Sequence, residues 1–400
     1  MKTRFRPESF PERRATSDEL RYFSYEPEPL PMKGDRKGSA MSQVFFVPLP
    51  DNPSLSDQVV AMRKLCERAG MARIIAPHDF VAIKVHVGEK YNTTHVKPEL
   101  IKVVVEAARA VTGNVFLTET ATLYKGERDN AVKHLLHAQA HGFGLERVGA
   151  PFIMADGLTG GSEVEVEVDG ELEKTVRIAR EAAYADVLIA VSHPTGHMIT
   201  GLGACLKNLG MGLASRAGKL RQHSSVAPAI KEDKCRYCRK CMQWCPAAAI
   251  TERGKKAFID PEKCTGCGEC LTVCRYDAVR YNWGTGSERL QKSMVEHALG
   301  VLKGKRDKCF FYNVLVDMTA DCDCMGRVQR KILPDIGILA ATDPVAIDAA
   351  TLDLTRRHGG GRTLAEKAYA DLDPTVQLRH AERLGMGSMS YELVSVRLDE

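Results

Sequence analysis

Two stretches in the middle of the chain carry cysteines at the same spacing. The first, KCRYCRKCMQWCPAAAI, covers residues 234–250, and the second, KCTGCGECLTVCRYDAV, covers residues 263–279. Each has the pattern Cys-x2-Cys-x2-Cys-x3-Cys. Three thiolates at this spacing can line a tight loop around three corners of an iron–sulfur cube, and the fourth corner needs a ligand from elsewhere. The repeat therefore predicts two cofactors that exchange a ligand.

The spacing is that of bacterial ferredoxins, in which the fourth cysteine of each run binds the cluster of the other run. This rule assigns one [4Fe–4S] cluster to Cys235, Cys238, Cys241 and Cys274, and a second to Cys264, Cys267, Cys270 and Cys245. A pair of zinc knuckles is the alternative, but zinc takes four ligands in all and does not require two complete runs. Thirteen cysteines with no recognisable signal peptide also favour metal ligation over disulfides.

The two runs differ at the residue after the fourth cysteine, which is Pro246 in the first and Arg275 in the second. Arg275 would add a positive charge near the cluster bound by Cys274, so the two clusters are expected to differ in potential. Residues 231–284 hold eleven Lys and Arg against seven Asp and Glu. That excess offsets the charge of about −4 on two oxidised clusters with their thiolates. The basic residues are therefore interpreted as charge compensation rather than as a docking patch.

Three further strings carry polar residues that could form a second site. In KVHVGEKYNTTHV, Lys84 and His86 alternate on one face of a predicted strand, and Gly88 allows a turn before Asn92 and Thr93. His86 is a candidate catalytic residue, and the other four are candidate cofactor-binding residues. Small polar residues here could bind an anion, although the phosphate-loop pattern is absent. A capped loop that satisfies its own backbone is the alternative.

The second string, SHPTGHMITGLGACLKNLGMGLASRAGKLRQH, leaves a predicted strand and contains many glycines. His193, His197 and Lys207 are candidate catalytic residues, and Asn208 and Lys219 are candidate cofactor-binding residues. Its glycines allow another group to approach the backbone closely, whether a ligand, the cysteine runs or another helix. Because the string leads directly into the first cysteine run, we expect it to lie between the clusters and a pocket. Plain helix packing is the alternative.

The third string, TADCDCMG, places Cys322 and Cys324 two residues apart between aspartates. In an extended chain both thiols point the same way, and cysteines so close rarely form a relaxed disulfide. The string favours a third metal site, with Cys205, His193 or His197 as candidate further ligands, and a redox pair is the alternative. In ATDPVAID, Asp343 and Pro344 are typical of a helix start.

The elements that would position these residues alternate between strands and helices. Strands are predicted over 80–88, 114–120, 152–158 and 309–317, and helices over 97–111, 129–143 and 288–303. Residues 180–193 run from helix into strand, residues 335–355 run from strand into helix, and residues 163–178 are typical of a hairpin. This alternation predicts an α/β fold with a mostly parallel sheet and helices on both faces. Ligand sites are expected at the carboxyl ends of its strands.

The cysteine runs interrupt this alternation, which resumes after residue 285. Residues 231–284 are therefore interpreted as an inserted α+β ferredoxin-like module, and residues 42–230 and 285–400 as one discontinuous α/β domain. Residues 1–41 combine mixed charges with no apolar periodicity, which predicts a disordered or extended arm. No apolar stretch follows Arg13 and Arg14, so a cytoplasmic rather than an exported protein is expected. Translation could start at Met1 or at Met41.

Composition narrows the classes of partner. A net charge of +5 over 400 residues is weak, so a nucleic-acid partner is not indicated. No apolar run of 18 residues is present, so no membrane span is expected. A redox partner protein or a small-molecule substrate remains.

Several long strings resemble the family of iron–sulfur center proteins named domain of unknown function 362. They include IKVHVGEKYNTTHV, FLTETATLYKGERDNAVKHLLHAQAHGF, ADGLTGG, GACLKNLGMGLASRAGKLRQH, DCDCMG and ILAATDPVAIDAATLDL, and they extend over residues 43–380. The resemblance implies an α/β domain, often with a two-cluster ferredoxin insert, in bacteria and archaea with anaerobic or versatile metabolism. It implies no substrate.

An electron carrier alone would not need more than three hundred further residues. The favoured interpretation is an oxidoreductase in which two [4Fe–4S] clusters pass single electrons to a ligand or substrate in the α/β domain. One alternative is an electron-transfer protein that docks a partner and has no chemistry of its own. Another is a protein that handles clusters, metal or sulfur, with a third site at Cys322 and Cys324. No flavin or nicotinamide fingerprint is visible.

Overall fold

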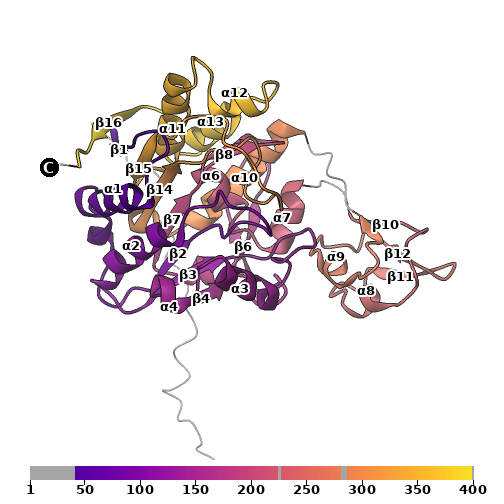
Figure 1. The fold of residues 1–400 in the computed structure, drawn as a ribbon. Helices are drawn as coiled ribbons and strands as arrows, with labels where there is room; N and C mark the ends of the chain where they lie inside the picture. Colours follow the sequence, from indigo (N-terminus) through magenta and orange to yellow (C-terminus); the bar gives the residue numbers. More distant parts are fainter. Residues whose placement is uncertain (1–40, 224–226, 281–285, 399–400) are drawn as a thin grey trace, which may run out of the picture. The chain divides into compact units, whose positions relative to one another are not determined.

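The computed structural model describes residues 41–223, 227–280 and 286–398 (Figure 1). The arm predicted over residues 1–41 lies outside this part of the chain, apart from Met41. Residues 40–400 group as one compact unit. The division of this unit into a discontinuous α/β domain and an inserted module stays a prediction.

A sheet of eight strands forms the centre of the molecule (Figure 1). Its order is β16 (Tyr391–Ser395), β1 (Ser42–Pro48), β15 (Gly337–Ala341), β14 (Cys309–Leu315), β7 (Val187–Ser192), β2 (Val81–Lys84), β3 (Val115–Glu119) and β4 (Phe152–Met154). The run from β14 to β4 is parallel, β1 is parallel to β16, and β15 is antiparallel to both its neighbours. The predicted, mostly parallel α/β sheet is confirmed.

Helices cover both faces of this sheet, because alternate strand residues supply two separate cores. Ile83 and Ile189 belong to the core under α1 (Leu55–Arg68) and α2 (Pro98–Arg109). Their neighbours Ala82 and Leu188 belong to the other core. That second core is covered by α6 (Cys205–Gly210), α10 (Ser287–Leu302), α11 (Pro344–His358) and α13 (Thr375–Arg383). In Figure 1, α11 and α13 lie together, away from α1 and α2.

Local signals explain several other elements. Pro98 starts α2, and the Asp343 carboxylate accepts the Val345 and Ala346 N–H groups at the start of α11. The predicted hairpin forms between β5 (Glu163–Glu167) and β6 (Thr175–Ala179). Shorter elements complete this part of the chain: α3 (Ala131–Ala140), α4 (Leu145–Val148), α5 (Arg180–Tyr184), β8 (Thr195–His197), β9 (Gly201–Gly203), α7 (Arg216–His223) and α12 (Leu364–Ala368).

Residues 229–280 form a small structure of their own, here called the cysteine module. It contains the strand pairs β10 (Ala229–Ile230) with β13 (Val279–Arg280) and β11 (Ile250–Arg253) with β12 (Lys256–Ile259), and the helices α8 (Lys240–Gln243) and α9 (Glu269–Val273). Its halves are related residue by residue. Positive φ angles occur at Tyr237, Arg239 and Ala248, and again at Gly266, Gly268 and Asp277, each twenty-nine positions later. The sequence repeat is therefore also a repeat of backbone shape.

No helix within the described ranges combines the length and the apolar character that a membrane crossing needs.

Candidate functional site

The parallel strands β14, β7, β2 and β3 end side by side, and a cavity of about 320 Å3 opens beyond their carboxyl ends. Seven of the predicted site residues line it: His86, His197, Lys207, Asn208, Lys219, Cys322 and Cys324. Apolar side chains form much of the remaining wall, from Leu123, Met198, Ile199, Met211 and Met325. We call this hollow the strand-end cavity.

The chain turns at the two cysteines of the cavity wall instead of running extended as predicted. The Met325 N–H donates to the Cys322 carbonyl at 3.0 Å, which closes a tight turn. The two thiols are hydrogen-bonded to each other. His86 Nδ1 accepts the Gly88 N–H at 3.1 Å, and its Nε2 lies 3.3 Å from Cys324 Sγ.

These contacts give the two thiols different pKa values. The Cys322 hydrogen bond, with His86 and Lys207, holds the pKa of Cys324 well below its usual range, although burial opposes this. The Cys324 sulfur and burial raise the pKa of Cys322. The pair therefore holds one thiolate, on Cys324.

Asp323 anchors this turn from behind. Its carboxylate accepts hydrogen bonds from Asn92 and Thr94, at 3.1 and 2.9 Å, and pairs with His193 at 2.7 Å. Burial lowers the pKa of His193, but Asp323 raises it by more, so that the imidazole stays protonated.

Five predicted site residues do not line the cavity: Lys84, which lies below it, and the four that hold or shape the neighbouring loop and turn. His193 and Asn92 do not line the cavity, because both are hydrogen-bonded to the Asp323 carboxylate and hold the turn. Gly88, at φ +76°, shapes the loop that carries Asn92. Thr93 is exposed. The internal hydrogen bonds of this segment favour the capped loop over the anion site, which stays a prediction.

A buried ion network below the cavity was missed from the sequence. Glu119, at the end of β3, lies 3.4 Å from Lys84 Nζ, 2.8 Å from His134 Nε2 and 3.8 Å from Arg128. Burial raises the pKa of Glu119, but Lys84, His86 and His134 hold it well below its usual range. Lys84 also donates to Asn208 Oδ1 at 2.8 Å and is wholly buried, so this predicted ligand-binding residue supports the floor instead.

Arg128 extends this network to the cavity wall. Its guanidinium donates to the Tyr124 hydroxyl at 2.6 Å and to Glu89 at 3.2 Å, and lies 3.2 Å from His86 Nε2. An acidic residue at a strand end, with an arginine in the following loop, is the signal that could have pointed to Glu119 and Arg128.

Lys207 is the cation whose head faces the cavity without a partner. No described residue accepts a hydrogen bond from its ammonium, and its stem packs beside Gly203. Burial lowers the pKa of Lys207, but Cys322, Cys324 and Asp323 raise it above the ordinary value, so the group stays charged. Across from it, burial and Lys207 hold the pKa of His197 well below its usual range, so this imidazole is neutral.

Two other predicted residues line the cavity with their polar atoms already bonded. Lys219 Nζ donates to the Ala121 and Ala214 carbonyls, at 2.9 and 3.0 Å, and to the Thr120 hydroxyl. Burial lowers the pKa of Lys219 to about 8. Asn208 donates to the Val191 carbonyl and the Ser192 hydroxyl. Both residues brace the wall.

Glycines in the segment 193–223 serve packing. A side chain at Gly210 would collide with the Met294 carbonyl of α10, and one at Gly212 would reach Lys84 Cε at 2.9 Å. At these two positions the close approach is to another helix and to Lys84, while the segment as a whole also lines the strand-end cavity, Gly212 included.

The eight thiols of the cysteine module lie close enough to influence one another, and their exchanged division into two ligand sets stays a prediction. The charges that act on Cys241 come from Cys274, Cys238 and Cys235, and with burial they raise its pKa to about 11. For Cys270, burial and the charges of Cys267, Cys264, Cys241 and Cys245, in that order, raise the pKa, so thiols of both predicted sets act on it. Backbone N–H groups of Ala249 and Ala278 donate to Cys245 and Cys274 Sγ, at 3.3 and 3.2 Å. Thiols gathered and hydrogen-bonded in this way fit cubane clusters.

One loop joins the cavity to the module. Leu123 and Tyr124 line the cavity, while the next residue, Lys125, donates its ammonium to the Cys274 carbonyl. A side chain at Gly268 of the module would touch Leu123 at 3.9 Å and Arg216 at 3.1 Å. Residues that wall the cavity and residues that flank the cluster cysteines are therefore in contact.

A third metal site gains no support from the arrangement. Cys205 lies in the core beside α11, where its N–H donates to Asp348, and His193 is held by Asp323. In the described part of the chain, no three His, Cys, Asp or Glu side chains are placed to hold a single metal ion. The same holds for the cysteines of the module. A four-iron cluster, however, holds its cysteine sulfurs further apart than a single metal ion does.

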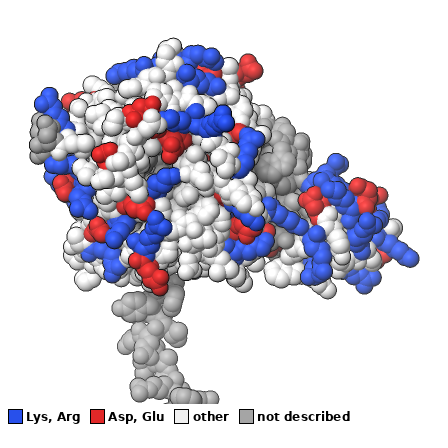
Figure 2. All heavy atoms as spheres, viewed as in Figure 1, with Lys and Arg blue, Asp and Glu red and all other residues white. Residues whose placement is uncertain are grey.

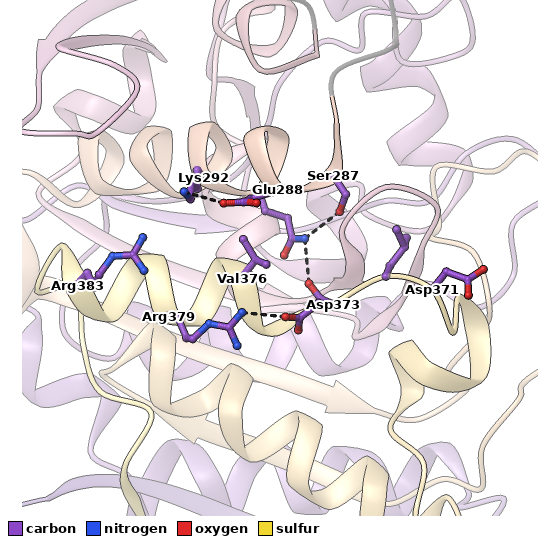
Figure 3. Close-up of a pocket in the computed structure, with 10 residues that line it drawn as sticks. Ser287, Glu288, Lys292, Asp371, Asp373, Val376, Arg379 and Arg383 are labelled. Atoms are coloured by element: carbon purple, nitrogen blue, oxygen red, sulfur yellow. Dashed lines mark hydrogen bonds and ion pairs between the residues drawn. The ribbon is translucent and has the colours of Figure 1, made fainter.

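A second hollow, of about 420 Å3, lies between α10 and α13 (Figure 3). Four of its charged residues form two pairs, Lys292 with Glu288 at 2.8 Å and Arg379 with Asp373 at 2.8 Å. Gln291 donates to the Ser287 hydroxyl and to the Asp373 carbonyl. These groups satisfy each other, so the strand-end cavity is the better candidate site.

Surface charge is mixed over the molecule (Figure 2). The surface formed by the cysteine module carries mainly Lys and Arg, with a few Asp and Glu among them. This agrees with the excess of basic residues counted in the sequence.

Comparison with known proteins gives the family. Residues 81–353 match the model of DUF362, a domain of unknown function, and the chain belongs to this family. The match spans β2 to α11 and includes the cysteine module.

Curated relatives match a much shorter segment. The chain is 42% identical over 67 residues to indolepyruvate oxidoreductase subunit IorA of Pyrococcus abyssi, which is 16% of this chain and 10% of that protein. It is 33% identical over 79 residues to pyruvate synthase subunit PorD of Methanothermobacter marburgensis, which is 20% of this chain and 90% of PorD. The chain thus spans a tenth of the IorA sequence and nearly all of PorD. The likeness supports iron–sulfur electron transfer in general.

Among solved structures, the lactate racemase apoprotein of Thermoanaerobacterium thermosaccharolyticum aligns with a TM-score of 0.35 and 12% identity. The alignment covers 67% of this chain and 55% of that one. A likeness at this level carries no argument.

Proposed function

We propose that this protein is an oxidoreductase in which two [4Fe–4S] clusters, held by the two cysteine sets of the module, deliver single electrons to a small anionic ligand in the strand-end cavity. The observation that carries the proposal is the loop 122–128. It walls the cavity with Leu123 and Tyr124 and contacts the module through Lys125 and Leu123. Bound clusters would supply one-electron chemistry.

The ligand class follows from the cavity wall. Lys207 presents an ammonium with no partner among the described residues, whereas Arg128 and Lys219 are already bonded. Methionines and Leu123 supply an apolar surface. A ligand with one anionic group on an apolar body satisfies both, since the Lys207 ammonium still has hydrogen bonds to donate and the rest of the wall offers few.

The test needs an acceptor of that class and a spectrum of the clusters. Reduced full-length protein is mixed with 4-nitrobenzoate, an anionic nitroaromatic electron acceptor, and cluster reoxidation is followed by visible absorbance. We expect a rate that saturates with acceptor concentration. In Lys207→Gln the half-saturating concentration should rise about 10- to 100-fold, the value of one charge-assisted hydrogen bond.

Lys174→Gln is the matched control, because this lysine side chain is 80% exposed on the β5–β6 hairpin. It should behave as the wild type. An iron content near eight atoms per chain, unchanged in both variants, shows that the clusters are intact. A rate that rises linearly with acceptor and is indifferent to Lys207 would refute a cavity-bound acceptor. It would leave the docking alternative, in which a partner protein takes the electrons at the surface.

A further inference from the structure

Of the five cysteines outside the module runs, two differ from the rest in their surroundings. Cys66, Cys205 and Cys309 are buried in the apolar cores, where burial raises the pKa of each. Cys322 and Cys324 reach the strand-end cavity and are hydrogen-bonded to each other across a tight turn. The electron-transfer scheme proposed above makes no use of them.

The surroundings of this pair suit thiol–disulfide chemistry. Cys324 Sγ lies 3.3 Å from His86 Nε2, and the positive charge of Lys207 acts on it. Hydrogen bonds and positive charges of this kind favour a thiolate, the nucleophilic form of cysteine. Cys322 stands next to it as a resolving thiol, and Asp323 between them fixes the turn through Asn92, Thr94 and His193.

We propose that Cys322 and Cys324 form a dithiol–disulfide couple that takes electrons from the clusters and reduces a small anionic disulfide bound in the strand-end cavity. This rests on the proposed function and names the substrate class of the same site. The Cys324 thiolate attacks one sulfur of the ligand, the ligand S–S bond breaks, and one thiolate leaves. Cys322 loses its proton and attacks Cys324 Sγ, so the second ligand thiolate leaves and the protein disulfide forms.

The couple is then reset by two electrons. The Cys322–Cys324 disulfide accepts one electron from each cluster in turn and one proton at Cys322, its S–S bond breaks, and the thiol–thiolate pair returns. Two one-electron donors match this two-electron acceptor. Cysteines two residues apart rarely close a relaxed disulfide, and a strained disulfide has a higher potential. The higher potential favours the reset by the clusters and opposes the first step, which therefore needs the ligand disulfide in excess.

The test uses full-length protein with both clusters, reduced anaerobically and freed of reductant. An excess of 3,3′-dithiodipropionate, a small dianionic disulfide, is added, and released thiol, cluster absorbance and the mass of the tryptic peptide 309–327 are followed. In the wild type we expect about four thiols per chain, since two electrons come from the dithiol and one from each cluster. The clusters should reoxidise, and the peptide should lose two hydrogens.

Cys322→Ser is the decisive variant, because it keeps the attacking thiolate and removes the resolving one. We expect about one thiol released per chain, a stable adduct on Cys324, and clusters that stay reduced. Cys309, on the same peptide and buried in β14, is the internal reference and should stay unmodified.

Two results would overturn the proposal. One is reoxidation of the clusters in Cys322→Ser as fast as in the wild type, which would mean that electrons reach the disulfide without the thiol pair. The other is a wild-type peptide that never loses two hydrogens. Either result, with about eight iron atoms per chain and saturable oxidation by 4-nitrobenzoate, leaves the proposed function standing. Failure of those two measurements would instead remove the proposed function itself.

Discussion

In the cysteine module, the sulfurs of Cys245 and Cys274 accept hydrogen bonds from residues four positions further along the chain. In the strand-end cavity, the sulfur of Cys324 contacts an imidazole 238 positions away. The module therefore places its reactive atoms by local, repeated backbone turns, whereas the cavity places them through the order of strands in the sheet. A module held by local turns can be inserted into a chain as a unit. A cavity at the ends of several strands instead depends on the stability of the whole fold.

The two regions also treat charge differently. The module gathers thiols that repel one another when they are thiolates. This arrangement suits a bound iron–sulfur core, which is positively charged without its thiolate ligands. The cavity instead neutralises its buried charges internally: Glu119 with Lys84 and Arg128, and Asp323 with His193. Loss of one thiolate should therefore cost the module a cluster, whereas loss of one member of a buried ion pair should destabilise the fold around the cavity.

The largest effect is expected from the exchanged ligand in the module. Cys274→Ala should lose about four of about eight iron atoms, because one cube lacks its fourth thiolate. Alkylation of the anaerobic protein, followed by mass spectrometry, identifies the cysteines that are set free. Exchange predicts Cys235, Cys238 and Cys241.

Cys245→Ala is the mirror experiment, and it should free Cys264, Cys267 and Cys270. If each variant instead freed the other three cysteines of its own run, the ligand sets would be those of two independent halves. The two pseudo-twofold halves of the module would then not exchange their fourth cysteine ligands.

On the cavity side, Glu119→Gln should cost about 3–5 kcal/mol of unfolding free energy, because the charge of Lys84 is left buried without its carboxylate and Arg128 keeps only Glu89. Urea unfolding followed by circular dichroism measures it. Glu99→Gln is the matched control. Its ion pair with Arg147 is largely exposed and should be worth about 0–1 kcal/mol. Equal losses in the two variants would contradict a cavity built on buried ion pairs.

The sequence predicts the features of the two regions that depend on local signals. It does not predict the contacts that depend on the tertiary structure. Cofactor ligands at fixed short spacings, and strands and helices with regular apolar periods, are local signals. They predicted the parallel sheet and the strand end that carries His86, and they predict the cysteine sets. Asp323 and Glu119 bind partners that are brought close only by the strand order. Their roles could not be predicted, because a lone acidic residue has many equivalent interpretations until its neighbours are known.

The turn at Cys322 shows the same limit on a smaller scale. Alternating Asp and Cys predicted an extended chain, but the Asp323 carboxylate is drawn inward by Asn92, Thr94 and His193. These tertiary hydrogen bonds bend the chain. The thiol pair therefore faces the cavity in a geometry that the spacing alone did not predict.

A smaller effect is expected from acid titration beneath the cavity. Asp348 accepts the N–H groups of Cys205 and Leu206 at the start of α6, the helix that carries Lys207. Burial raises the pKa of Asp348 to about 6, so the folded state binds its proton more tightly than the unfolded chain does. This contribution is complete below the unfolded pKa of about 3.9 and is lost as the pH rises through 6.

Between pH 5 and 7 the unfolding free energy should therefore fall by about 1 kcal/mol through this residue. Asp348→Asn should remove that part of the slope, which is measured as the difference between the urea unfolding curves of wild type and variant at each pH. Curves that stay parallel would show that Asp348 keeps the same proton affinity folded and unfolded.

The smallest effect is expected where the two halves of the module differ in sequence. Arg275 is exposed, with its guanidinium 6.0 Å from the Tyr276 ring, and Cys274 before it has φ −78° and ψ 97°, which a following proline tolerates. Arg275→Pro should therefore change the unfolding free energy by less than about 0.5 kcal/mol. Loss of the positive charge should make the potential of the cluster bound by Cys274 slightly more negative, as measured by a redox titration with paramagnetic resonance. Pro246→Arg should shift the other cluster in the opposite direction. If neither potential moves, the charge at this position is screened by solvent, and any difference between the clusters comes from backbone hydrogen bonds to sulfur.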